Sequence, residues 1–334
     1  MIIGIDDSGD FETHSQGMYA AVFIRPKKAE HIKRKFEEWE SRLPVGSKDE
    51  RGEVKGWMLS KDQLLDFARS IMNDNGYGQI KHHVFAIPVG SDSQIALEKQ
   101  RQKHLVQYQA GIDEYREQGK EFFAIAGFYI QLSEWLTKRS MKSLAKLELL
   151  SFTVYRALNL AIITSTVRHF DKELGKLTIK IDEGLVGRPS TKAYWQDSLR
   201  SAVWNFSRQE GIIHVKEWQS GHPFLKRFYQ YPKSTETLGV FSDEIRKCMD
   251  FYDSKDHFEI RIADIVASTY FRTYVQKEDL YEVIKALRPT QIVFKGSYTL
   301  LQLGMRDDAD KSNPYTDRIN GVTLEEIRHK YGDV

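Results

Sequence analysis

Short apolar runs alternate with longer amphipathic segments along the chain. The apolar runs have the length and continuity of buried β-strands and cover residues 2–6, 18–24, 80–89, 177–182 and 212–218. Apolar side chains recurring every three or four positions predict helices over residues 27–43, 60–72, 190–207, 258–276 and 278–287. Because strands and helices interleave, the pattern predicts an α/β fold.

Residues 94–171 are helical in pattern throughout. Within them, residues 141–163 are apolar on one broad side, which is typical of a core helix. No linker rich in Pro, Gly or Ser divides the chain. We therefore predict one main domain over residues 1–276, with a helical insertion at about 94–171 and a C-terminal extension over 277–334.

Local signals define the boundaries of several elements. Ser60 with Gln63 forms the sequence pattern of a capping box at a helix start. The Ser-Gln-Gly turn at residues 15–17 lies between the first two apolar runs, so these two runs are expected to form a hairpin.

Composition describes a soluble protein without a strong charge preference. The 334 residues are 41% hydrophobic and 29% charged, with a formal net charge of +2. The single cysteine, Cys248, excludes an internal disulfide and a cysteine-based zinc site. No uncharged run exceeds twelve residues, short of the roughly 20 that span a bilayer. We expect a cytoplasmic protein without membrane contact; its oligomeric state is open.

Acidic residues follow two of the predicted strands directly. Asp6 ends the first apolar run, and Asp182 ends the run at 177–182. Ligands gather at the carboxyl ends of parallel strands, so the two side chains lie together if these strands are parallel neighbours. An acid at a strand end more often simply meets solvent, and that alternative stays open for each taken alone.

Two further acids have local explanations of their own. Asp264 lies at the margin of the apolar face of helix 258–276, where Arg261 or His257 offers a nearby ion-pair partner. Glu53 lies in the charged segment Glu-Val-Lys-Gly, where an exposed pair with Lys55 is the simplest interpretation.

Taken in order, four short motifs resemble a known family. Ile-Asp-Asp-Ser-Gly-Asp at 5–10, Glu-Val-Lys-Gly at 53–56, Ile-Asp-Glu at 181–183 and Ile-Ala-Asp-Ile-Val-Ala at 262–267 are similar to the motifs of the bacterial and phage family called domain of unknown function 3800. That family belongs to the ribonuclease H-like superfamily. The chain departs from it at Asp7, where the family usually carries Glu, and near Arg261, where the usual Gln is absent.

The resemblance implies a five-stranded mixed sheet flanked by helices, with four acids at one edge. Those acids would be Asp6, Glu53, Asp182 and Asp264. Enzymes of this superfamily hold divalent metal ions with such residues and cut phosphodiester bonds. The implied cofactors are Mg²⁺ or Mn²⁺ in a two-ion site, and the implied partner is DNA or RNA.

Residues around the four acids are expected to support them. The two-residue alternation of a strand places Asp7 on the side opposite Asp6. Ser8 and Asp10 would shape the following turn or lie behind the site. Glu183 adjoins Asp182. Lys55 or Lys180 would contact phosphate, although for each an ordinary solvated lysine is the commoner case.

Basic clusters give a weaker signal for nucleic acid. Lys33 and Arg34 have i,i+4 spacing to Glu37 and Glu38, which favours a salt-bridged surface helix. A second basic set lies in the helical insertion and would track phosphates, although a solvated face is the simpler interpretation. It comprises Lys99, Arg101, Lys103, His104, Lys138, Arg139, Lys142 and Lys146.

Other functional classes fit less well. The opening segment also resembles the first phosphate loop of actin-like and sugar-kinase ATPases, but the later glycines form no matching loop. A Walker loop and zinc-protease histidine spacing are absent from the sequence. The remaining alternative is a non-catalytic ribonuclease H-like module for nucleic-acid binding or assembly, in phage defence or a mobile element.

Overall fold

The fold of the protein is taken from a computed structural model, which describes most of the chain. The described residues are 1–9, 16–73, 80–88, 91–186, 191–209, 215–218, 221–230, 239–240, 244, 247–292 and 299–300.

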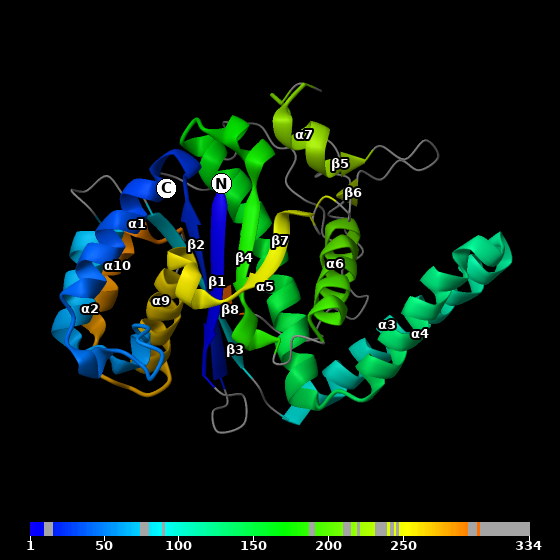
Figure 1. The fold of residues 1–334 in the computed structure, drawn as a ribbon, viewed down its shortest axis with the longest axis horizontal. Helices are drawn as coiled ribbons and strands as arrows, with labels where there is room; N and C mark the ends of the chain where they lie inside the picture. Colours follow the sequence, from blue (N-terminus) through cyan, green and yellow to red (C-terminus); the bar gives the residue numbers. More distant parts are fainter. Residues whose placement is uncertain are drawn as a thin grey trace.

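A mixed β-sheet forms the centre of the molecule (Figure 1). Its main strands are β1 (Ile2–Ser8), β2 (Gln16–Ile24), β3 (Ile80–Pro88), β4 (Thr178–Asp182) and β7 (Met249–Tyr252). They lie in the order β7-β4-β1-β2-β3, and a two-residue strand, β8 (Thr299–Leu300), continues the edge beside β3. The β1–β4 and β4–β7 pairs are parallel, whereas β1–β2 and β2–β3 are antiparallel. A separate pair, β5 (Tyr229–Gln230) with β6 (Gly239–Val240), lies outside this sheet.

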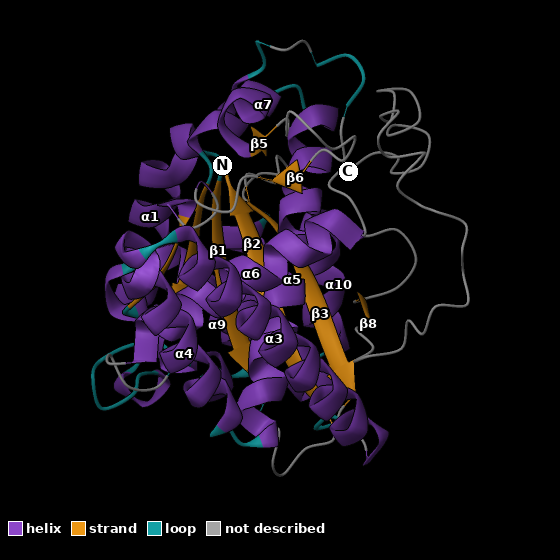
Figure 2. Cartoon of the chain, turned by 90° about the vertical axis from the view of Figure 1, so that its right-hand side faces the viewer, coloured by secondary structure: helices purple, strands orange, loops and turns teal. Residues whose placement is uncertain are grey.

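Helices cover both faces of the sheet. They are α1 (Pro26–Ser41), α2 (Lys61–Phe67), α3 (Ser91–Gln118), α4 (Phe123–Thr137), α5 (Met141–Val167), α6 (Lys192–Gln209), α7 (Pro223–Phe228), α9 (Phe258–Tyr274) and α10 (Tyr281–Leu287). Figure 1 shows α1, α2, α9 and α10 on one side of the sheet, and Figure 2 shows α5 and α6 in front of the strands from the other side. The α/β class and the mixed sheet flanked by helices are therefore confirmed.

Each face of the sheet has its own apolar core, as strand alternation requires. Ile3 and Ile5 of β1 pack with α5 and α6, whereas Ala20 and Val22 of β2 pack with α1, α2 and α9. After Ile2, the α9 side of β1 carries Gly4 and Asp6 instead of further large apolar side chains. This alternation turns Asp6 toward α9.

Helix α5 contributes many of its side chains to the apolar core. By length and composition it is long and apolar enough to cross a membrane, but 83% of its most apolar window is buried within the protein. The same test is passed by core helices of soluble proteins, so this helix is weak evidence for a membrane span.

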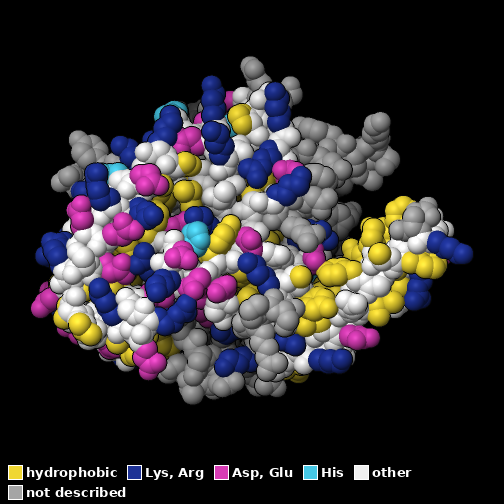
Figure 3. Space-filling model, in the orientation of Figure 1, with side chains coloured by type: hydrophobic (Ala, Val, Ile, Leu, Met, Phe, Trp, Pro, Cys, Tyr) yellow, Lys and Arg dark blue, Asp and Glu magenta, His cyan; other side chains and the backbone are white. Residues whose placement is uncertain are grey.

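Helices α3 and α4 form an antiparallel arm that projects from the body (Figure 1). Figure 3 shows apolar side chains gathered on this arm, and Phe123 and Ile125 of α4 are 52% and 41% exposed. The predicted insertion at 94–171 thus contains two unlike parts: the projecting α3–α4 pair and the core helix α5.

Most predicted elements correspond to observed ones, with shifted ends. The capping box at Ser60 and Gln63 is present, but α2 ends at Phe67 and continues as a π-helix over Ala68–Met72. The predicted strand at 212–218 is wrong in its described part, where Val215 makes an isolated bridge and a turn follows. Besides β1, β4 pairs with β7, a strand that the sequence pattern missed because it is only four residues long.

Candidate carboxylate site

Strands β1 and β4 bring Asp6 and Asp182 together. The strands run parallel, and Ile5 is directly opposite Ile181, so the two acids that follow occupy neighbouring positions on the sheet. Asp6 is buried, with its Oδ1 accepting the Asp7 N–H at 2.8 Å. Asp182 is half-buried, and its Oδ2 accepts the Gly184 N–H at 3.0 Å. These two strands are thus parallel neighbours, the arrangement that the contact between Asp6 and Asp182 requires.

Helix α9 supplies Asp264 by packing directly onto β1. A Cβ atom on Gly4 would lie 2.3 Å from the Glu259 carbonyl oxygen, so only glycine allows this approach of the helix to the strand. Asp264 is buried one turn further along α9. It does not pair with Arg261, which instead binds Glu40 of α1 at 2.6 Å.

The loop before α2 supplies Glu53 and Lys55. The Asp49 side chain accepts the N–H groups of Arg51 and Glu53 at 3.0 and 2.9 Å, and Gly52 has a φ of +77°, so the loop turns back tightly. Glu53 is buried and its Oε1 accepts a hydrogen bond from Lys55 Nζ at 2.9 Å. The expected Glu53–Lys55 pair therefore exists, but its acid lies inside the protein.

A short 3₁₀ helix, η2 (Gly56–Met58), fastens this loop to α9. The Gly56 N–H donates to Asp264 Oδ2 at 3.0 Å, and a Cβ atom on Gly56 would lie 2.7 Å from Ile265 Cα. Arg272 of α9 donates to the carbonyl oxygens of Gly56 and Leu59 at 3.1 and 2.7 Å. These contacts hold the loop that carries Glu53 against the helix that carries Asp264.

The acids influence one another electrostatically. Burial raises the pKa of Asp6 well above its ordinary value, and repulsion from Asp182 and Asp264 raises it further. Burial raises the pKa of Asp182 to about 6, with a contribution from Glu53 that Lys55 opposes. Burial likewise raises the pKa of Asp264 to about 6, against the Gly56 hydrogen bond and Lys55. We call these four side chains (Asp6, Glu53, Asp182 and Asp264) the carboxylate cluster.

Lys55 is the cation nearest this cluster among the described interactions. Burial works against its charge, but the Glu53 hydrogen bond and attraction to Asp264, Glu53 and Asp6 raise the pKa of its ammonium group. Its side chain keeps 24% exposure, whereas that of Glu53 keeps 1%. The ammonium group therefore lies where the buried acids meet solvent.

The chemistry of the cluster fits a hard divalent cation, but its geometry is not that of a finished metal site. Carboxylate oxygens are the ligands that Mg²⁺ and Mn²⁺ prefer, and a cation would relieve the repulsion between the acids. Within the described residues, however, no group of three or more His, Cys, Asp and Glu side chains is arranged to hold one ion. Both oxygens of Asp264 instead accept hydrogen bonds, Oδ2 from Gly56 and Oδ1 from Ser268 at 3.2 Å.

The predicted supporting residues differ in where they lie. Asp7 turns to the opposite side of β1, as expected, and is 3.4 Å from Lys146 of α5. Ser8 Oγ is 3.4 Å from Ser268 Oγ and so adjoins the hydrogen bond to Asp264. Glu183 is exposed at the start of a 3₁₀ helix, η7 (Glu183–Leu185), and Asp10 lies outside the described residues.

Much of the basic set in the insertion has structural contacts. Arg101 donates to the carbonyl oxygens of Thr137 and Arg139 at 3.2 and 3.1 Å, which satisfies the end of α4. His104 is buried, and its Nε2 lies 2.8 Å from Glu148 Oε1. The Lys33–Glu37 and Arg34–Glu38 pairs on α1 are present at 3.9 and 4.0 Å, as the sequence favoured.

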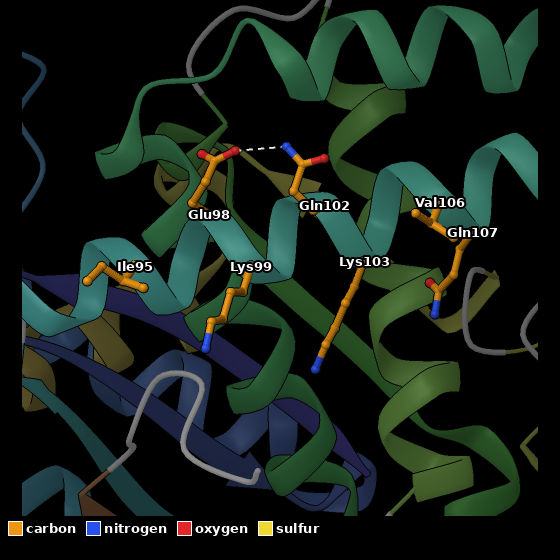
Figure 4. A pocket seen from close by; sticks show the side chains of 7 residues that line it. All are labelled: Ile95, Glu98, Lys99, Gln102, Lys103, Val106 and Gln107. Carbon is orange, nitrogen blue, oxygen red and sulfur yellow. Dashed lines mark hydrogen bonds between the residues drawn. The ribbon is translucent and has the colours of Figure 1, made fainter. Parts of the chain in front are cut away.

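A pocket on α3 is a different feature from the carboxylate cluster. Figure 4 shows its seven described lining residues, all from one helix, with Lys99 and Lys103 pointing the same way. The Gln102 amide donates to Glu98 at 2.9 Å within it. These residues bring no acid, base or nucleophile cluster together, so the pocket is a weaker candidate for chemistry.

Comparison with known proteins gives no match. No family model, no curated protein and no solved structure matches the chain.

Sequence reasoning missed the residues that assemble the cluster. Gly56, Ser268 and Arg272 join the loop to α9, yet each is an ordinary residue type in its local sequence. A signal existed for Gly56, because it ends the Glu-Val-Lys-Gly motif and glycine permits a close approach of two backbones. No comparable signal existed for Ser268.

Proposed function

We propose that this protein is a metal-dependent phosphodiester hydrolase, a nuclease of the ribonuclease H-like type suggested by its motifs. The observation that carries the proposal is the parallel pairing of β1 with β4 together with the close packing of α9 on β1. These contacts bring Asp6 and Asp182 next to Asp264, with Asp6 and Asp264 buried and Asp182 half-buried. These acids come from three separate elements, and their pKa values are raised by burial and by neighbouring acids. Gathering carboxylates away from water costs free energy, and such arrangements are concentrated at functional sites.

A cation-binding role explains that cost. Asp6, Glu53, Asp182 and Asp264 would hold Mg²⁺ or Mn²⁺, which would supply a water nucleophile at neutral pH and stabilise charge on the leaving oxygen of a phosphodiester. Asp264 would have to exchange hydrogen bonds with Gly56 or Ser268 to ligate an ion. That requirement is consistent with a cluster that closes when the ion arrives.

The chain's own residues would organise the substrate around the cluster. Lys55 is partly exposed at its rim, so its ammonium group is available to a phosphate once a metal ion takes over the charge of Glu53. Gly56 and Arg272 keep the Lys55 loop fixed on α9. Positioning of this kind is a large part of phosphoryl-group catalysis.

A non-catalytic nucleic-acid-binding or assembly module is the second candidate. The observation that favours it is the missing ready-made metal site among the described residues. In that case no metal ion would balance the carboxylate cluster. Some of its acids would stay protonated, and Glu53 would stay paired with Lys55.

Cleavage assays separate the two candidates. Purified protein is incubated with end-labelled single-stranded DNA, single-stranded RNA, duplex DNA and hybrid, with Mn²⁺, Mg²⁺ or EDTA. We expect metal-dependent cleavage of at least one substrate, and a loss of at least about 100-fold in Asp6→Asn and Glu53→Gln, since each removes a ligand charge.

Glu50→Gln is the matched control, because Glu50 is an exposed acid in the same loop. It should cleave at the wild-type rate, and circular dichroism should show all variants folded. Cleavage that persists in Asp6→Asn and Glu53→Gln, or no cleavage of any substrate by the wild type, would reject the hydrolase.

A further inference from the structure

An exposed tryptophan, Trp57, directly follows Gly56, whose N–H binds Asp264 of the carboxylate cluster. Trp57 is 65% exposed, whereas Trp39, Trp135, Trp195 and Trp218 are buried, each at 8% exposure or less. Leaving an indole in water forgoes the burial free energy of one of the largest apolar side chains. An exposed aromatic side chain beside a proposed active site therefore suggests a ligand that covers it.

The backbone around Trp57 is fixed on both sides. Gly56 N–H is bonded to Asp264, and the Gly56 and Leu59 carbonyl oxygens both accept from Arg272. Leu59 is buried at 1% exposure. The indole ring is thus carried by a turn whose backbone is already fixed. This lowers the entropic cost of ordering the turn when a ligand binds.

The position of Trp57 relates it to the reaction proposed above. It follows Lys55 by two residues, and Lys55 touches Glu53 of the cluster. A strand whose phosphate lies at the cluster would therefore place a neighbouring base within reach of the indole. Bases offer a flat π-face to such a ring whatever their sequence.

We propose that Trp57 is a base-stacking residue, which binds an unpaired base of a single-stranded nucleic acid beside the carboxylate cluster. The proposal rests on the proposed function for its choice of ligand, and it narrows the substrate to single strands. In a duplex each base is already stacked between its neighbours, so it offers no free face to an indole.

Binding is measured by fluorescence anisotropy with fluorescein-labelled single-stranded DNA and RNA 12-mers and with a 12-base-pair duplex. CaCl₂ is included so that a hard cation offsets the carboxylate charge, and gels check that the strands stay intact. We expect Trp57→Ala to weaken single-strand binding by about 5- to 150-fold, the range for one stacked base. Trp57→Phe should keep most of the affinity because it keeps an aromatic face.

Phe123→Ala is the matched control, because Phe123 is also an exposed aromatic residue (52%) but lies on the projecting arm. It should bind as the wild type does. Wild-type affinity in Trp57→Ala, equal affinity of the wild type for duplex and single strand, or no binding to any strand would each overturn the proposal. Trp57-dependent binding without any metal-dependent cleavage would support it while rejecting the hydrolase, so the two failures are distinguishable.

Discussion

Asp264 is a buried carboxylate whose two oxygens accept hydrogen bonds from neutral donors. Gly56 N–H and the Ser268 hydroxyl bind it; the charge of Lys55 lowers its pKa and that of Glu53 raises it. Neutral donors offset only part of the cost of burying a charge. The pKa of Asp264 is consequently raised to about 6.

This raised pKa predicts a pH-dependent effect of removing the charge. An ordinary Asp has a pKa near 3.8 in the unfolded chain, so the unfolded state ionises first as pH rises. Asp264 therefore lowers the free energy of unfolding of the metal-free protein as pH rises from about 4 to about 6. Asp264→Asn, which keeps the shape, should be more stable than the wild type by about 1–3 kcal/mol at pH 8 and equal to it near pH 4.

Urea unfolding in EDTA at pH 4 and pH 8 checks this prediction. The exposed Asp62 at the start of α2 provides a control, since Asp62→Asn should show no such gain at pH 8. A lower stability of Asp264→Asn at pH 8 would mean that the carboxylate is a net stabiliser and that the repulsion is unimportant.

The site residues differ in how far the sequence alone identified them. The side preference of Asp6 and Asp7 followed from strand alternation and is confirmed by the contact of Asp7 with Lys146. Glu53 was singled out by resemblance, because nothing local distinguishes a buried Glu–Lys pair from an exposed one. Its burial depends on the packing of η2 against α9, a contact between residues more than 200 positions apart.

At the level of elements, the approach of α9 to β1 sets the position of the cluster. Gly4 permits that approach, because a Cβ atom there would lie 2.3 Å from Glu259 O and 2.6 Å from its carbonyl carbon. Backbone atoms cannot move aside as a flexible side chain does. We expect Gly4→Ala to lower the free energy of unfolding by about 1–3 kcal/mol or more, and to weaken metal-dependent activity by shifting Asp264 away from Asp6.

Gly46→Ala is the control for this substitution. A Cβ atom on Gly46 would have no neighbour within 4 Å, so the change should leave stability within about 0.5 kcal/mol of the wild type. Denaturant unfolding of both variants gives the comparison. Equal stability of Gly4→Ala and the wild type would mean that the contact between β1 and α9 accommodates an added methyl group without cost.

Element boundaries followed from the sequence where local chemistry specifies them. The capping box of Ser60 begins α2 as predicted, and apolar runs identified β1 and β4. Strand β7 was not predicted, because Met249–Tyr252 has only four residues and only two of its side chains are buried. The order of the strands in the sheet cannot be predicted from local hydrophobic periodicity, because β1 pairs with β4 across more than 170 residues.

At the scale of the whole molecule, the carboxylate cluster joins distant parts of the chain. Its members come from β1, β4, α9 and the loop before α2, on one side of the sheet (Figure 1). The α3–α4 arm projects elsewhere and carries exposed apolar side chains, among them Phe123 and Ile125 (Figure 3). An ion bound at the cluster would therefore link β1, β4, α9 and the loop before α2, which come apart when the whole protein unfolds.

That connection predicts that a divalent ion stabilises the entire fold. A ligand that binds only the folded state raises the free energy of unfolding by about 2.7 kcal/mol when its concentration is 100 times its Kd. The wild type should thus melt at a higher temperature as MnCl₂ is added, at constant ionic strength. Asp6→Asn should show a much smaller rise, because it lacks a central ligand charge.

Two features of the melting curves test the interpretation. The rise in melting temperature on adding MnCl₂ should grow as the pH increases from about 5 to 8. Protons compete with the ion near and below the raised pKa values of Asp182 and Asp264, which are both about 6. Calorimetry or tryptophan fluorescence follows the transition. An equal rise in Asp6→Asn would place the ion elsewhere on the surface, and the absence of any rise at pH 8 would leave Lys55 as the cation that balances the cluster.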